Sequence, residues 1–245
     1  MSAATKESSL LGRVSPEEFY WSGYTDSLLH AQGLGSESSL AWEDLGLRAG
    51  MGKGKINAQI KQQIMNCTAC ELYKTRTYPV PGDGPIWSPL ALVGEAPGAE
   101  EDVVGRPFIG ASGKFLFDPT TGVIPTTIGY QREHIRVVNC VRCRPPGNRN
   151  PLSEEIKSCA QYLRYEILNM QPKVILCVGK FPATWFAGQD VTIGSVRGRP
   201  FEWNGIPVVV TYHPAYALRQ GKSPKIMEQI RSDLLVARSI IDQAD

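Results

Sequence analysis

The sequence has no apolar run that approaches the ~18 residues needed to cross a membrane. Its N-terminus has no positively charged stretch followed by an apolar segment, which is the mark of a secretory signal. Transit peptides are poor in acidic residues, whereas this segment carries Glu7, Glu17 and Glu18. These absences predict a cytoplasmic protein without a membrane partner.

A strong excess of one charge is also missing, because the formal net charge is +2 and the pI is near 8.2. Nucleic-acid-binding domains often exceed a pI of about 9, so any contact with phosphates must come from local clusters of basic residues. There is no internal repeat and no long low-complexity tract. Hydrophobic residues make up 42% of the chain, which is enough for a core and excludes wholesale disorder. We expect the chain to act as a monomer.

Residues 1–60 differ from the rest in being rich in Ser, Gly and Leu. They end in a small, basic run at 49–55 that predicts a linker. Ser15-Pro16-Glu17-Glu18 has the spacing of a capping box and predicts the start of a helix. We therefore expect an N-terminal extension over 1–60, partly helical or mobile, and one domain over 61–245.

From residue 61 onwards, short apolar runs alternate with helical patterns. The runs at 90–93, 135–139, 174–178 and 208–211 lack a polar alternation, as expected of parallel strands that are buried on both faces. Helices are predicted at 153–169 and 225–241. The fold class is therefore α/β, a three-layer α/β/α sandwich with a small, mostly parallel central sheet.

Polar residues follow these predicted strands at the edge where open α/β sheets bind ligands. Glu95 comes after the first strand, Asn139 ends the second, and His213 follows the fourth. Alone, each has an ordinary structural explanation, since a glycine- and proline-rich turn is usually only a turn and a lone His is usually solvated or hydrogen-bonded. Their convergence on one cleft is what predicts a site.

The six cysteines are expected to be metal ligands or core residues, because a reducing compartment disfavours disulfides. Two pairs have the C-x-x-C spacing, Cys67 with Cys70 and Cys140 with Cys143, and together they suggest a zinc ribbon. Against this pairing, Cys140 adjoins Asn139 on a strand, so the two side chains point to opposite faces. Cys177 lies in an apolar strand and is typical of a core cysteine.

Three segments, in order, resemble the motifs of the family-4 uracil-DNA glycosylases. They are Gly94-Glu95-Ala96-Pro97-Gly98 with Gly-Arg-Pro-Phe-Ile-Gly at 105–110, Asn139 with Cys-Arg-Pro-Pro-Gly-Asn-Arg at 143–149, and Tyr-His-Pro-Ala-Tyr-Ala-Leu-Arg at 212–219. The resemblance runs from about Cys67 to Arg219. Two departures stand out. Asp-Pro-Thr-Thr-Gly at 118–122 interrupts a helix that the family continues, and 148–158 lacks the His-containing insertion of the covalent, uracil-trapping relatives.

The resemblance implies an enzyme that flips uracil out of single- or double-stranded DNA and hydrolyses its N-glycosidic bond, leaving an abasic site. It also implies a 4Fe–4S cluster held by Cys67, Cys70, Cys143 and Cys159, a ligand set that competes with the zinc pairing. Two other readings stay open, a non-catalytic module that binds uracil-containing or damaged DNA and a zinc-ribbon DNA-binding protein.

Roles follow for individual residues. We expect His213 to donate to uracil O2, and Glu95 or Asn148 to position water. Phe108 stacks on the base, Asn139 reads its edge, Glu101 crowds C5, and the backbone at Gly94 and Ala96 lies near O2. Tyr216 or Leu218 fills the vacated stack. Phosphates are expected to meet a basic cluster of Arg142, Arg144, Arg149, Arg197, Arg199, Arg219 and Lys222.

Overall fold

The computed structural model describes residues 51–244, so the helix predicted from Ser15 lies outside the described residues. The compact domain begins at Lys53, the first residue of α3 (Lys53–Met65). Ile56, Ile60 and Ile64 are buried at helical spacing, and α3 packs against α7 (Ser153–Met170). The predicted linker is therefore wrong for its last three residues, and the boundary expected after residue 60 falls inside a helix.

The four predicted strands are confirmed, each within two residues at its ends: β1 (Leu90–Gly94), β2 (Arg136–Asn139), β3 (Val174–Val178) and β5 (Ile206–Thr211). The sheet has the order β2-β1-β3-β5-β4, and all pairings are parallel except that of β4 (Phe201–Trp203) with β5. The short edge strand β4 was not predicted. A turn at Asn204-Gly205, with φ of 49° and 73°, joins it to β5.

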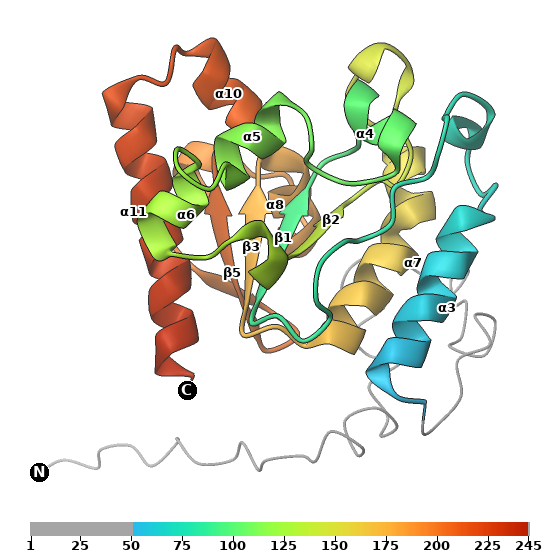
Figure 1. Ribbon diagram of the computed structural model, residues 1–245, viewed down its shortest axis with the longest axis horizontal. Helices are drawn as coiled ribbons and strands as arrows, with labels where there is room; N and C mark the ends of the chain where they lie inside the picture. The colour runs from blue at the N-terminus through green and yellow to red at the C-terminus, as the bar shows by residue number, and fades with distance from the viewer. Residues whose placement is uncertain (1–50, 245) are drawn as a thin grey trace, which may run out of the picture. The chain divides into compact units, whose positions relative to one another are not determined.

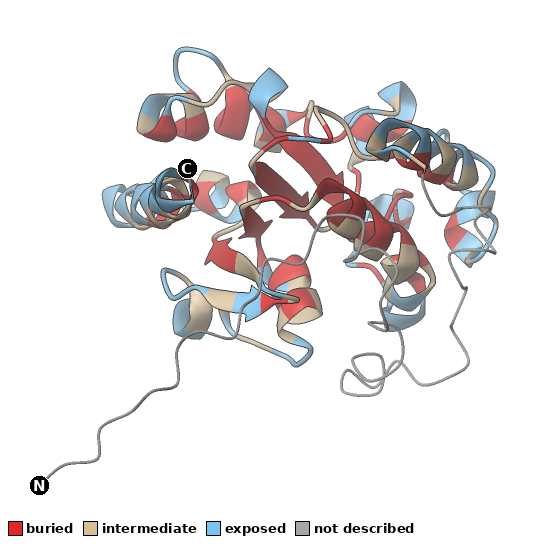
Figure 2. Ribbon diagram, turned by 90° about the horizontal axis from the view of Figure 1, so that it is seen from below, coloured by how far each residue is buried: buried red, intermediate tan, exposed pale blue. Residues whose placement is uncertain are grey.

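Helices cover both faces of this sheet (Figure 1). Leu90 and Leu92 pack in a core that includes residues of α5 (Ala111–Phe117), α6 (Val123–Ile128) and α11 (Pro224–Gln243). Ala91 and Val93 point the other way, to a core that includes α7 and α8 (Lys180–Ala187). Figure 2 shows the buried strands between helices whose outer surfaces are exposed. The three-layer α/β/α fold and its mostly parallel sheet are thus confirmed.

Short elements gather beyond the carboxyl ends of the strands, where α4 (Ala99–Val104), α5 and α10 (Pro214–Arg219) lie past the arrowheads in Figure 1. The predicted helix break is confirmed there, because α5 ends at Phe117 and α6 begins at Val123. Hydrogen bonds from Thr121 and Thr120 hold the pKa of the intervening Asp118 down at about 2.

The remaining short helices are η2 (Glu71–Lys74), η3 (Arg132–His134), η4 (Pro146–Asn148) and α9 (Ile193–Val196). Among the described residues, no helix is both long and apolar enough to span a membrane.

Candidate active site

The centre of the candidate site is a close approach of three residues at the ends of β1 and β2. Gly94 and Asn139 are register partners across the two strands. A Cβ atom added to Gly94 would lie 2.5 Å from Asn139 Oδ1 and 2.5 Å from Phe108 Cζ. Glycine is therefore required at position 94 for the amide and the aromatic ring to meet there.

The side chain of Asn139 is only 2% exposed, and its Oδ1 atom has no hydrogen-bond partner among the described residues. A buried acceptor left without a partner costs about 1–3 kcal/mol. An amide oxygen at the carboxyl end of a parallel sheet, beside an aromatic ring, is thus ready to accept a hydrogen bond from a planar ligand.

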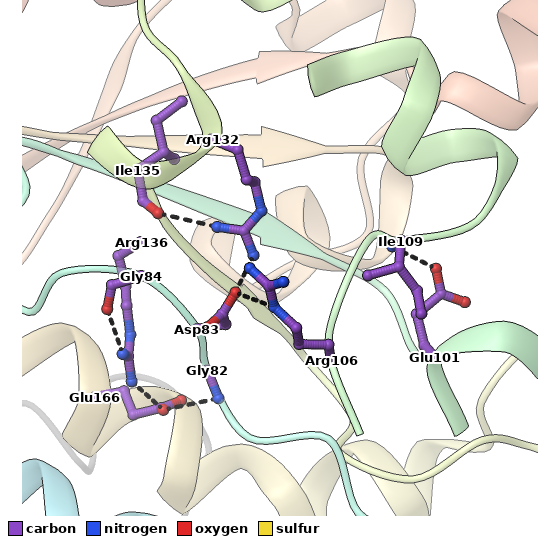
Figure 3. A network of polar contacts seen from close by, with 10 residues as sticks. All are labelled: Gly82, Asp83, Gly84, Glu101, Arg106, Ile109, Arg132, Ile135, Arg136 and Glu166. Carbon is purple, nitrogen blue, oxygen red and sulfur yellow. Dashed lines mark hydrogen bonds and ion pairs between the residues drawn. The ribbon is translucent and has the colours of Figure 1, made fainter. Parts of the chain in front are cut away.

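Phe108 lies on a strained loop, with a positive φ of 54°, and its ring meets that of Phe117 edge-on. The carboxylate of Glu101 holds this loop. Its Oε1 accepts from the backbone N–H groups of Ile109 at 3.0 Å (Figure 3) and Gly110 at 2.9 Å. Its Oε2 accepts from the N–H of Gly98 at 3.1 Å. Both oxygens of Glu101 are thus engaged in positioning the Phe108 loop, and its role at C5 of a base stays a prediction.

His213 is the N-cap of α10, and its Nδ1 accepts the backbone N–H of Ala215 at 3.1 Å. The proton of the neutral ring is then on Nε2, which is left as a donor. Burial, aided by the positive charge of Arg219, lowers the pKa of His213 to about 4, so the ring is neutral near pH 7. The ring centroids of His213 and Phe108 are 6.5 Å apart, which brings this donor beside the pocket of Gly94 and Asn139.

Glu95 is the first residue after β1, at the same edge of the sheet, and is partly buried. Burial raises the pKa of its carboxyl to about 7, and within the described residues that carboxyl has no hydrogen-bond partner. Its negative charge adds to burial in raising the pKa of the Cys140 thiol. A carboxyl with a pKa close to neutrality, at the carboxyl ends of the strands, is suited to proton transfer or to stabilising a developing cation.

A second site lies on the other side of β2. One cavity is lined by Cys67, Cys70, Cys143 and Cys159, together with Arg76, Arg142 and Tyr162. Cys140 and Cys177 do not line it and belong to the core. Burial raises the pKa of Cys159 to about 12 and that of Cys143 to a lesser extent. In the part of the chain that the structure describes, no three His, Cys, Asp or Glu side chains form a group that could hold a single metal ion.

Comparison with known proteins shows the family of the chain. The model of the uracil DNA glycosylase superfamily matches residues 81–235. A type-4 uracil-DNA glycosylase of Archaeoglobus fulgidus is 38% identical over 182 residues, which cover 71% of this chain and 87% of that protein. The chain belongs to the type-4 uracil-DNA glycosylases. Proteins of the same name from Sulfurisphaera tokodaii and Thermotoga maritima are 38% and 37% identical, over 70% and 74% of this chain and 80% and 93% of theirs.

In this type-4 glycosylase the short helix α10, which follows β5, carries the two predicted wedge candidates. Tyr216 is 37% exposed and stacks on Tyr212, with ring centroids 5.1 Å apart. Leu218 is half-buried and packs against the core, so it does not project as a wedge would. Arg219 is exposed at the end of α10. Of the two predicted wedge candidates, the geometry favours Tyr216.

Three of the arginines expected at phosphates have partners inside the glycosylase fold. Arg149 forms a bidentate pair with Glu155, at 2.6 and 2.9 Å, and so pins the start of α7. Arg197 is held by the buried Asp233 at 2.8 Å. Arg142 is 1% exposed and cannot reach DNA. The basic surface that remains comes from Arg144, Arg199, Arg219 and Lys222.

Asn148 does not join the three strand-end residues. It is exposed in η4, and its Oδ1 accepts from Arg144 Nε at 2.7 Å. No hydrogen bond links it to Glu95, Asn139 or His213 among the described contacts. Gly179, which directly follows β3, packs against His213, since a Cβ there would lie 3.1 Å from the histidine Cβ. Its φ of 100° lies in a region that glycine tolerates best.

Proposed function

We propose that this glycosylase flips uracil out of DNA, binds it between Phe108 and Asn139, and hydrolyses the N-glycosidic bond to leave an abasic site. The observation that carries the proposal is the buried, unpartnered Oδ1 of Asn139 beside the ring of Phe108. The test is incubation of the purified protein with a uracil-containing oligonucleotide, followed by alkaline cleavage of abasic sites. Tight binding without cleavage would instead assign the fold to a binding module.

Base selection is assigned to Phe108 and Asn139. The ring of Phe108 offers a face for stacking, and the amide of Asn139 offers one acceptor and one donor for uracil N3–H and O4. Cytosine presents the opposite pattern at these two atoms and is rejected. The backbone N–H groups at Glu95 and Ala96 are near enough in sequence to Gly94 to face O2 of the same base.

Bond cleavage is assigned to His213 and Glu95. Negative charge builds on uracil O2 as the bond breaks, and the Nε2–H of neutral His213 stabilises it in the manner of an oxyanion-hole donor. Glu95, with a pKa of about 7, positions the attacking water or stabilises the sugar cation. Asn148 is exposed and engaged by Arg144, which favours Glu95 for the water.

DNA binding is assigned to exposed and half-buried residues around this edge. Arg144, Arg219 and Lys222 are free of carboxylate partners among the described residues and suit phosphate oxygens. Tyr216, already stacked on Tyr212, fills the gap that the flipped base leaves. The protein acts on the DNA as a single chain.

The second site is assigned to a 4Fe–4S cluster held by Cys67, Cys70, Cys143 and Cys159. Four thiols line one cavity, and four thiolates are the usual ligand set of such a cluster. Arg76 already donates to Cys143 Sγ at 3.1 Å, which favours a thiolate there. Because the ligands come from segments far apart in sequence, the cluster would tie the segment after α3 to β2 and α7.

Serine substitution of a proposed ligand cysteine is expected to remove iron and visible colour and to lower the unfolding temperature. The physical reason is that a bound cluster contributes its binding energy to folding. Iron content, absorption and thermal unfolding measure this for each of the four positions. Cys140→Ala and Cys177→Ala are the matched controls, since both residues are buried but lie outside the cavity. Loss of iron in the Cys140 variant, with iron retained in the Cys159 variant, would restore the zinc-ribbon pairing.

Asn139→Asp is expected to reduce uracil excision and to relax the discrimination against cytosine. A mismatched hydrogen bond in a buried pocket costs about 1–3 kcal/mol, or roughly 5- to 150-fold in rate. Excision from matched uracil- and cytosine-containing oligonucleotides gives the ratio of the two rates. Asn204→Asp, on the β4–β5 turn, makes the same change in charge far from the pocket and should leave both rates unaltered. Normal uracil excision by the Asn139 variant would remove this residue from the pocket.

A further inference from the structure

Arg142 is buried and only partly satisfied. It lies shortly after the end of β2 at Asn139, and its side chain is 2% exposed. Its Nη2 donates to Glu166 on α7, whereas Nε and Nη1 have no hydrogen-bond partner among the described residues. Arg142 also lines the cavity of the four cysteines. A buried N–H donor of a charged group that lacks an acceptor costs free energy. A further acceptor is therefore expected at this cavity.

The charges around Arg142 do not balance. The carboxylate of Glu166 pairs with Arg136 as well as with Arg142, and Arg136 Nη2 lies 2.9 Å from Glu166 Oε1. The same Oε1 also accepts the backbone N–H of Gly82 at 3.2 Å (Figure 3). Two guanidiniums and one carboxylate leave a formal charge of +1. The exposed fractions of the three side chains are 6% or less, so water screens this charge poorly. An anion at the cavity would therefore stabilise these three side chains.

The cysteine cavity is where that anion would lie. Arg142 lines this cavity together with Cys143 and Cys159, and its Nε and Nη1 lack partners among the described residues. Arg76, which also lines the cavity, donates to Cys143 Sγ at 3.1 Å. Arg76 is partly exposed and Arg142 is buried, so both an outer and an inner cation meet the cavity.

We propose that Arg142 is the buried counter-charge of the cysteine site: it stabilises the four thiolates and thereby holds the iron–sulfur cluster and raises its reduction potential. This inference rests on the proposed cluster. Net charge and hydrogen bonds to sulfur are the means by which proteins tune such centres. Glu166 has the positioning role, because it holds the far end of the guanidinium.

The test compares Arg142→Met with Arg136→Met in the full-length protein. Each change leaves one arginine paired with Glu166 and converts the +1 group into a neutral pair, but only Arg142 lines the cavity. Iron content, iron release to a chelator and reductive titration followed by EPR are measured, with thermal unfolding as the check on folding. Arg142→Met is expected to release iron about 10–100-fold faster, the usual loss for an outer-shell partner of a metal site. The reduction potential of the cluster should fall by at least ~59 mV, which for one electron corresponds to a tenfold change in the reduction equilibrium.

Arg142→Lys should recover part of the wild-type iron retention and reduction potential. Lysine keeps the positive charge but lacks the forked N–H donors of the guanidinium. Arg136→Met should keep the wild-type release rate and potential. Equal loss of iron in the two methionine variants, or wild-type release and potential in Arg142→Met, would overturn the inference. Absence of iron from the wild-type protein would remove the cluster itself, an outcome that the iron analysis separates from failure of the Arg142 proposal.

Discussion

Replacing His213 with alanine is expected to slow the chemical step of uracil excision by about 10²–10³, the usual loss for one oxyanion-hole donor, while DNA affinity changes little. The reason lies in the tautomer. Because Nδ1 is occupied by the N–H of Ala215, the imidazole presents Nε2–H, and burial keeps the ring uncharged. Single-turnover excision at saturating enzyme, paired with binding to an uncleavable uracil analogue, measures the two quantities separately.

Two control variants distinguish the role of His213 Nε2 as a hydrogen-bond donor from the role of Nδ1 in capping α10. His213→Ser keeps an acceptor for the first turn of α10 but has no Nε2 donor, so it should be as slow as the alanine variant. His134 also accepts a backbone N–H through Nδ1, from Gln131, but it precedes β2 at the opposite edge of the sheet, and its alanine variant should be fully active. With a pKa of about 4, His213 should cause no loss of activity as the pH rises through ~6.5. Equal losses in binding and rate would make His213 a DNA contact and end the proposed mechanism.

The sheet was predictable because four of its strands are buried on both faces. Strands such as β3, with every residue buried, produce continuous apolar runs that cannot be confused with amphipathic helices. The edge strand β4 escaped because it has three residues, of which only Trp203 is buried. Its one local signal, Asn204-Gly205, is typical of a tight hairpin turn but was not used.

The convergence of Asn139 and His213 was predictable for a topological reason, since carboxyl ends of parallel strands share one edge of a sheet. Sequence cannot reveal which polar atoms are already satisfied there. Glu101 follows Gly98 at capping-box spacing, and that pattern indicates a helix cap rather than a base contact. Its function as the anchor of the Phe108 loop depends on contacts across eight and nine residues.

The basic residues also show that sequence does not reveal which polar groups already have partners in the fold. Arg142, Arg149 and Arg197 stand beside loop residues in the sequence and were expected at phosphates. Each is used within the fold because its partner, Glu166, Glu155 or Asp233, comes from a helix that no local pattern connects to it. Among the described residues, a carboxylate partner distinguishes these three arginines from Arg144 and Arg219, and such partners follow from tertiary packing rather than from composition.

Replacing Glu95 with glutamine is expected to lower the rate of excision by about 10²–10⁴, the range for a group that takes part in proton transfer or charge stabilisation. Burial raises the pKa of Glu95 to about 7, so the wild-type rate should increase as the pH rises through that value and then level off. The variant should lack this dependence. Glu100→Gln, at an exposed position on the same segment, is the matched control and should retain the wild-type profile.

The same substitution should stabilise the protein at alkaline pH. The folded-state pKa of about 7 lies above the ordinary value of 4.5, so the folded protein holds this proton more tightly than the unfolded chain. That preference is fully present below the unfolded value and is lost as the pH rises through about 7. At pH ~8 the buried carboxylate therefore costs up to roughly 3 kcal/mol, which glutamine removes. Denaturant unfolding of both proteins at acid and alkaline pH measures the difference, which should vanish under acid conditions. A slower variant that is no more stable at pH ~8 would mean that Glu95 is solvated in solution, and its pKa could not then account for the pH profile.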